Sequence, residues 1–119
     1  MALAKTGLGA ITPISGISTA AVYTVSSSKS AYIRGLTFFN NSSSDSAVVS
    51  VHIVPNNGGS VGTAATTNKI ARLTLSANDT YFLEFAYPVT LSANNDTVQV
   101  NTETAAVACN VLVVGDKEA

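Results

Sequence analysis

Leu75-Ser76-Ala77-Asn78-Asp79-Thr80 recurs, with one added asparagine, as Leu91-Ser92-Ala93-Asn94-Asn95-Asp96-Thr97. Each copy follows a short apolar run and precedes another one. Asparagine and aspartate tolerate the left-handed backbone and form hydrogen bonds within their own turn. Each copy therefore predicts a strand, a tight turn and a second strand, and two such turns so close together predict a compact all-β domain.

Apolar and polar residues alternate with a period of two from residue 21 onward, and this period is typical of strands. Gly35 interrupts one run and predicts a bulge there. About eight short strands without helices between them indicate an antiparallel β-sandwich, jelly-roll-like, over residues 21–119. The expected strands cover residues 22–25, 31–40, 47–55, 70–75, 80–85, 89–92, 96–102 and 106–115.

Residues 1–20 differ from the rest and predict an extended N-terminal arm, because they contain glycine and proline and show no helical spacing of apolar residues. A signal peptide is disfavoured, since the glycines and Pro13 break the apolar run. Two roles for the arm stay open. It becomes ordered on a partner or a neighbouring subunit, or it adds a strand to its own sandwich.

The composition argues against several classes of partner. Only 11% of the 119 residues are charged, and the formal net charge is -1. Such a chain has no basic surface for the phosphates of nucleic acid. No apolar run approaches the roughly 18 residues of a membrane span, so we expect no nucleic acid and no membrane as partner.

The most apolar segment, residues 105–114, contains the single cysteine. We expect Cys109 to be a buried apolar residue, because the only histidine lies in a different strand. Both faces of this segment are apolar: Val107, Cys109, Val111 and Val113 on one, Ala108, Leu112 and Val114 on the other. Either the domain covers both faces, or one face meets another subunit.

No residues form a pattern that predicts catalysis, so we expect no enzyme, no catalytic residues, no cofactor and no metal. His52 alternates onto the polar face of its strand and is expected to be solvated. Glu84, Arg34 and Arg72 lie within strands, where cross-strand ion pairs are the simplest reading. Asp79 and Asp96 are expected to cap their turns, and the alternative is one calcium site shared between the two turns.

Two further patterns carry little weight. The glycines at positions 58, 59 and 62 form no phosphate loop, since no Lys-Ser/Thr pair follows them. The glycosylation sequons arise from a composition rich in asparagine, serine and threonine; they begin at Asn40, Asn41, Asn78 and Asn95.

About four-fifths of the chain resembles the small β-sandwich virion proteins of tailed bacteriophages. The motifs of this resemblance are apolar patterns and turns, so they bear more on the fold than on the role. They are Tyr23-Thr24-Val25, Lys29, residues 31–40, residues 49–55, residues 73–83, residues 88–91 and Asp96-Thr97-Val98.

The resemblance implies a structural protein of the virion. Its first reading is a capsid decoration (cement) protein that binds the outer surface formed by the phage major capsid protein, as a homo-oligomer with a trimer as the first guess. The alternative is a tail fibre, neck or baseplate module that contacts host glycans. A secreted carbohydrate-binding or hydrolytic domain is a third class, weakened by the absence of tryptophan.

Overall fold

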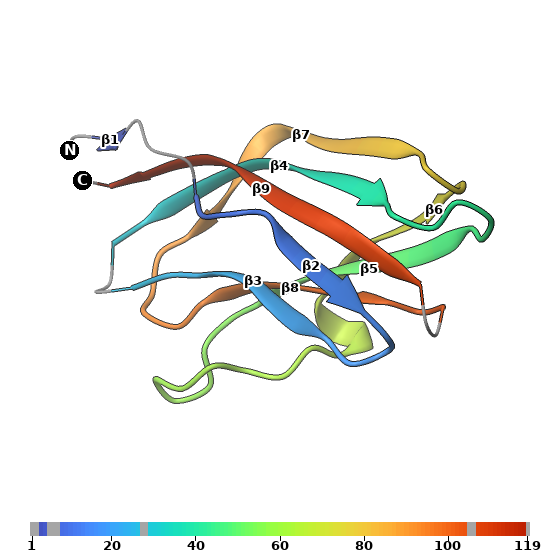
Figure 1. Cartoon of the computed structure of the whole chain (residues 1–119). Helices are drawn as coiled ribbons and strands as arrows, with labels where there is room; N and C mark the ends of the chain where they lie inside the picture. The colour runs from blue at the N-terminus through green and yellow to red at the C-terminus, as the bar shows by residue number, and fades with distance from the viewer. Residues whose placement is uncertain (1–2, 5–7, 27–28, 105–106, 119) are drawn as a thin grey trace.

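Two antiparallel sheets packed face to face make up the molecule, as the sequence predicts for an all-β sandwich (Figure 1). The computed structural model describes residues 3–4, 8–26, 29–104 and 107–118. Sheet A contains β1 (Leu3–Ala4), β2 (Thr12–Ser15), β4 (Ala31–Asn40), β7 (Thr80–Leu91) and β9 (Ala108–Glu118). Sheet B contains β3 (Ala20–Thr24), β5 (Ala47–Val54), β6 (Lys69–Leu75) and β8 (Thr97–Thr102).

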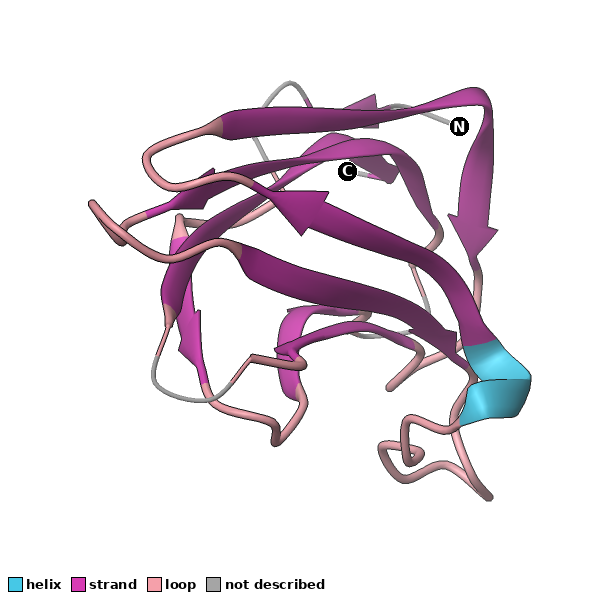
Figure 2. Cartoon of the chain, turned by 90° about the vertical axis from the view of Figure 1, so that its right-hand side faces the viewer, coloured by secondary structure: helices cyan, strands magenta, loops and turns pink. Residues whose placement is uncertain are grey.

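The strands from β2 to β9 pair in a nested order. β2 pairs with β9, β3 with β8, β4 with β7, and β5 with β6. The additional pairs β4–β9 and β5–β8 join these four strand pairs into the two sheets. The pairing is thus that of one long hairpin that folds back between β5 and β6. The two layers that the strands form are visible in Figure 2.

The core lies between the layers because the period of two places every second side chain on the inner face. Ile33, Leu36 and Phe38 of β4 are fully buried and face sheet B. Val49 and Val51 of β5 are also fully buried in the same cluster. The inward residues of β9 are those expected from the sequence, Cys109, Val111 and Val113, and Val107 just before the strand is buried with them.

The bulge expected at Gly35 is confirmed. The register of β4 shifts between Ile33 and Gly35 relative to both neighbouring strands. A Cβ atom on Gly35 would lie 2.5 Å from the carbonyl oxygen of Leu83, so only glycine allows this approach of the two backbones.

The described part of residues 1–20 pairs with its own chain, which is the second alternative for the arm. Thr12 lies opposite Val111, and Ser15 lies opposite Ala108. Ile14 and Leu8 are buried in the core, whereas Ile17 is exposed. The physical reason is that β9 has an edge with which β2 pairs, and this pairing also places Ile14 of β2 in the apolar core. Residues 1–2 and 5–7 lie outside the described part.

One strand assignment was wrong. Residues 80–85 and 89–92 were expected to be two strands, but they form a single strand, β7. The break between them is an outward arch, after which pairing with β4 resumes at Val89 and Ile33. Pro88 cannot donate a hydrogen bond and so interrupts the ladder, but the chain does not leave the sheet.

Candidate functional site

The two repeated turns have the geometry that the sequence predicts. Asn78 and Asn95 adopt the left-handed conformation, with φ of 55° and 68°. The amide of Asp79 donates to the carbonyl of Ser76, and the amide of Asp96 donates to that of Ala93. The first turn joins β6 to β7 and the second joins β7 to β8.

The turns lie too far apart for the shared calcium site that was kept as an alternative. They lie at opposite ends of β7, which pair with Ala31 and Phe39 of β4, roughly 26 Å apart at about 3.3 Å per residue. The described residues also contain no group of three or more histidine, cysteine, aspartate or glutamate side chains that could hold a metal ion. Asp79 is exposed, and its carboxylate accepts the amide of Thr80, 3.0 Å away.

Asp96 is buried and anchors the second turn. Its Oδ1 atom accepts hydrogen bonds from the backbone amide and the side-chain amide of Asn56, at 2.9 and 3.1 Å. Its Oδ2 atom accepts the amide of Ala93 at 3.0 Å. Burial alone would raise the pKa of Asp96, but these hydrogen bonds favour the carboxylate and outweigh it, so the pKa is lowered.

This lowered pKa predicts a loss of stability in acid that depends on Asp96. A group with a depressed folded-state pKa stabilises the fold above its unfolded pKa, about 3.9 for aspartate, and loses that contribution as the pH falls through the folded pKa. Urea unfolding measured from pH 6 to pH 2 should show a shallower acid decline in Asp96→Asn than in the unchanged chain. Asp45→Asn, at an exposed acid, should retain the full decline. Equal slopes for all three proteins would contradict this role.

The sequons occupy different environments. Asn40 is fully buried and binds backbone groups, so its side chain is not available for modification. Asn95 donates to the carbonyl of Gly59 at 2.7 Å. Gly58 and Gly59 both have positive φ and form a tight turn, not a phosphate loop. Asn41 and Asn78 are exposed.

The expectation for His52 was wrong, because its side chain is buried, with 4% of its surface exposed. The loop between β5 and β6, which contains the short helix η1 (Thr66–Asn68), covers the outer face of sheet B. Gln99 Nε2 donates to the carbonyl of Gly62 in this loop at 3.0 Å. Alternation along β5 was therefore read correctly, but the polar face is covered by a loop that alternation cannot reveal.

A polar cluster lies under and beside this loop. Glu103 accepts from the Ser50 hydroxyl, from Arg72 Nε at 3.0 Å, and lies 3.9 Å from Lys69 Nζ. The Ser50 hydroxyl and then Arg72 lower the pKa of Glu103. Burial lowers the pKa of His52, whose Nδ1 atom is 3.3 Å from the carbonyl oxygen of Gln99. Sequence reasoning missed Ser50 and Glu103, which are separated by 53 positions.

This cluster holds strands together and does not have the geometry of a nucleophile and its base. The hydroxyl of Ser50 donates to a carboxylate, and His52 faces a backbone carbonyl instead of that hydroxyl. A carboxylate with a lowered pKa that is already held by an arginine is a weak base. The cluster links β5, β6 and the end of β8.

Cys109 is buried in the apolar core as expected, and burial raises the pKa of its thiol. The expected cross-strand ion pairs form with other partners. Arg34 Nε lies 2.8 Å from Asp116, and Arg72 Nε lies 3.0 Å from Glu103. Glu84 has no ion-pair partner within the described part of the chain.

The outer face of sheet A is a candidate binding surface. The outward residues of β9, Leu112 and Val114, are only partly buried, so within the described residues one face of this strand packs in the core and the other borders solvent. Ile11 is 60% exposed and Phe82 48%. We call the apolar residues of this surface the sheet A face; they are Ile11, Phe39, Phe82, Leu112 and Val114.

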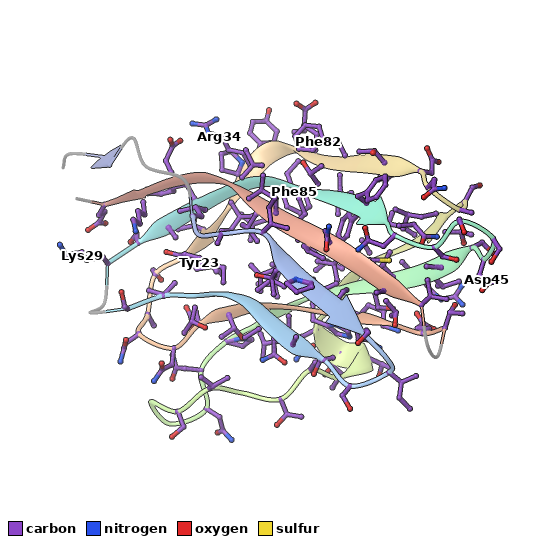
Figure 3. The ribbon with its side chains drawn as sticks, viewed as in Figure 1. Tyr23, Lys29, Arg34, Asp45, Phe82 and Phe85 are labelled. Carbon is purple, nitrogen blue, oxygen red and sulfur yellow. The ribbon has the colours of Figure 1, made fainter. Side chains whose placement is uncertain are left out.

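Two shallow hollows lie on the sheet A face. One, of about 210 Å³, is lined by Ile11, Thr37, Phe39, Asn110 and Leu112. The other, of about 460 Å³, lies beside the arch of β7 and contains both aromatic and charged side chains (Figure 3). Its lining residues are Arg34, Phe82, Glu84, Phe85, Ala86, Pro88 and Val114.

Comparison with protein-family models, with curated proteins and with solved structures finds no match for this chain. No helix in the part of the chain that the structure describes is long and apolar enough to cross a membrane. The arguments about function therefore rest on the sheet A face and its two hollows.

Proposed function

We propose that this chain is a structural virion protein of a tailed bacteriophage, and specifically a capsid decoration protein that binds the outer capsid surface as a homo-oligomer. The observation that carries the proposal is the sheet A face, an apolar surface on a chain with few charges. Such a face associates by shape and apolar contact, with little cost from desolvating ions. Its occupants would be a second copy of the chain or the major capsid protein.

We infer further that the sandwich is a jelly roll. The nested pairing of β2 with β9, β3 with β8, β4 with β7 and β5 with β6 supports this, because jelly rolls consist of eight strands in two Greek keys. Viral capsid domains use this architecture, but so do lectins and other proteins, so the fold supports the proposal without selecting it. The motif resemblance to phage virion proteins also supports the proposal.

Self-association is tested with one charge placed on the sheet A face. Light scattering should give the unchanged chain the mass of a homo-oligomer, with a trimer as the first expectation. Leu112→Glu should be monomeric with an unchanged circular dichroism spectrum, because a carboxylate in an apolar contact is costly. Ile70→Glu, at an exposed apolar position on sheet B, is the matched control and should remain oligomeric.

Cryo-electron microscopy of particles that contain the chain tests the location. Density repeated regularly over the outer capsid surface is the expected result. Density in a fibre, neck or baseplate would contradict decoration and support the tail alternative. An unchanged chain that is monomeric at high concentration and associates with no particle would overturn the structural role as a whole.

A further inference from the structure

The larger hollow exists because β7 arches away from β4. Ile33 pairs with Val89 and Gly35 pairs with Glu84, so a single residue of β4, Arg34, lies opposite the four residues 85–88 of β7. The arch is visible near the label of β7 in Figure 1. It exposes Tyr87, 87% of whose surface is accessible, and opens the hollow of about 460 Å³ over the sheet.

The hollow combines aromatic rings with an unpaired carboxylate. Phe82 and Phe85 both line it, and Phe82 is about half exposed. The guanidinium of Arg34 is already paired with Asp116 at 2.8 Å. Glu84 forms no ion pair with any described residue. Arg34 and Glu84 are the two charged residues in the lining, and Asp116, which lies outside it, already pairs with Arg34, so the Glu84 carboxylate is left without an ion-pair partner among the described residues.

A carboxylate beside aromatic faces is suited to a cation. The face of a phenylalanine ring attracts an ammonium or guanidinium group, and the carboxylate neutralises its charge. β7 also forms one end of sheet A, so its outer edge has no neighbouring strand among the described strands. An edge strand accepts an extended peptide by main-chain hydrogen bonds.

We propose that the hollow binds a lysine or arginine side chain from an extended segment of a partner protein that lies along the free edge of β7. The charge complementarity at Glu84 selects the basic side chain, and the edge of β7 aligns the segment that carries it. This site goes beyond the virion proposal and does not depend on it. A sugar is the less suitable occupant, because the exposed ring in the lining of the hollow is the phenylalanine Phe82 and a neutral sugar leaves the Glu84 carboxylate unpaired.

To test the proposal, the peptide acetyl-Thr-Val-Lys-Val-Thr-amide is added in steps to the isotope-labelled full chain. Binding is measured from the shifts of the amide NMR signals of the chain. We expect the amide signals of Arg34 and residues 82–87 to shift, with a dissociation constant on the order of a millimolar. The same peptide with norleucine in place of lysine should bind about fivefold more weakly. Binding of the lysine peptide should also weaken as salt is added, because the site is open to solvent.

Three variants identify the groups responsible. Glu84→Gln should weaken binding of the lysine peptide about fivefold. Phe82→Ala should weaken binding of the same peptide about threefold, because it removes the ring face. Asp45→Asn removes the same charge at the far end of the molecule from Arg34 and Phe82 (Figure 3) and should bind normally. Each variant keeps a folded NMR spectrum, since Glu84, Phe82 and Asp45 are all exposed.

The proposal is overturned by any of four results. The norleucine peptide binds as tightly as the lysine peptide; Glu84→Gln and Asp45→Asn behave alike; the shifted signals lie away from the arch; or no signal shifts at 10 mM peptide, which is about ten times the expected constant. A neutral oligosaccharide that shifts the same signals more strongly than the peptide would likewise replace a basic side chain with a glycan as the occupant.

Discussion

Gly115→Ala should lower the free energy of unfolding by about 3 kcal/mol, the upper part of the range for overpacked cores. A Cβ atom at this position would lie 2.1 Å from the carbonyl oxygen of Tyr32 and 3.1 Å from the amide nitrogen of Arg34. Both of these are backbone atoms of the bulge in β4, which is held between β7 and β9. The clash therefore cannot be relieved by a change of rotamer, and the bulge itself must move.

Urea unfolding measures this loss, which is a large part of the 5–15 kcal/mol typical of a domain. Ala108→Val is the control on the same strand, because Ala108 is exposed and added methyl groups meet solvent there. It should change the free energy of unfolding by less than about 0.5 kcal/mol. A Gly115→Ala protein as stable as this control would show that β4 and β9 do not approach as closely as the structure has them.

Asn40→Ala should lower the free energy of unfolding by a similar amount, about 3 kcal/mol, because it removes the side-chain partner of one buried and three part-buried backbone groups. The Nδ2 atom of Asn40 donates to the carbonyl oxygens of Asp45, Leu75 and Ser76, at distances of 2.9–3.3 Å. Its Oδ1 atom accepts the amide of Ser42 at 2.9 Å. One fully buried side chain thus ties the loop after β4 to the first repeated turn.

Asn41→Ala is a matched control, since it removes the same chemical group from the next residue. Asn41 is exposed, and its Nδ2 atom donates to Asn110 Oδ1 at 3.1 Å. Denaturation of this variant should differ from the unchanged chain by less than about 0.5 kcal/mol. If both asparagine variants lose the same small amount, the burial and bonding of Asn40 would not matter to stability.

The two repeated turns show which features the local sequence can predict. Asn78 and Asn95 adopt the left-handed backbone because their side chains tolerate it, and this tendency belongs to the residue and its neighbours. The anchors of the turns come from elsewhere in the chain. Asn40 holds the first turn from 35 positions away, and Asp96 of the second turn binds Asn56, 40 positions away. No local pattern marks these partners.

Some features of the candidate site could likewise be predicted from the sequence, and others could not. The two apolar faces of residues 107–114 were readable from alternation, and so was the burial of Cys109. The burial of His52 under the loop after β5 could not be predicted from alternation, since it depends on where that loop folds back. The hollow beside Glu84 was also not readable, because the four residues of the arch oppose one residue only after β4 and β7 pair.

The sequence by itself determined the class of the fold, the bulge at Gly35 and the turns, since period-two alternation, glycine and asparagine act over a few neighbouring residues. Only the tertiary structure decided that β2 completes sheet A, that Arg34 and Arg72 pair with Asp116 and Glu103, and that Glu84 is left without a described ion-pair partner. These outcomes depend on the register between strands distant in the chain. Register is set by the summed packing of the whole core, which no short segment contains.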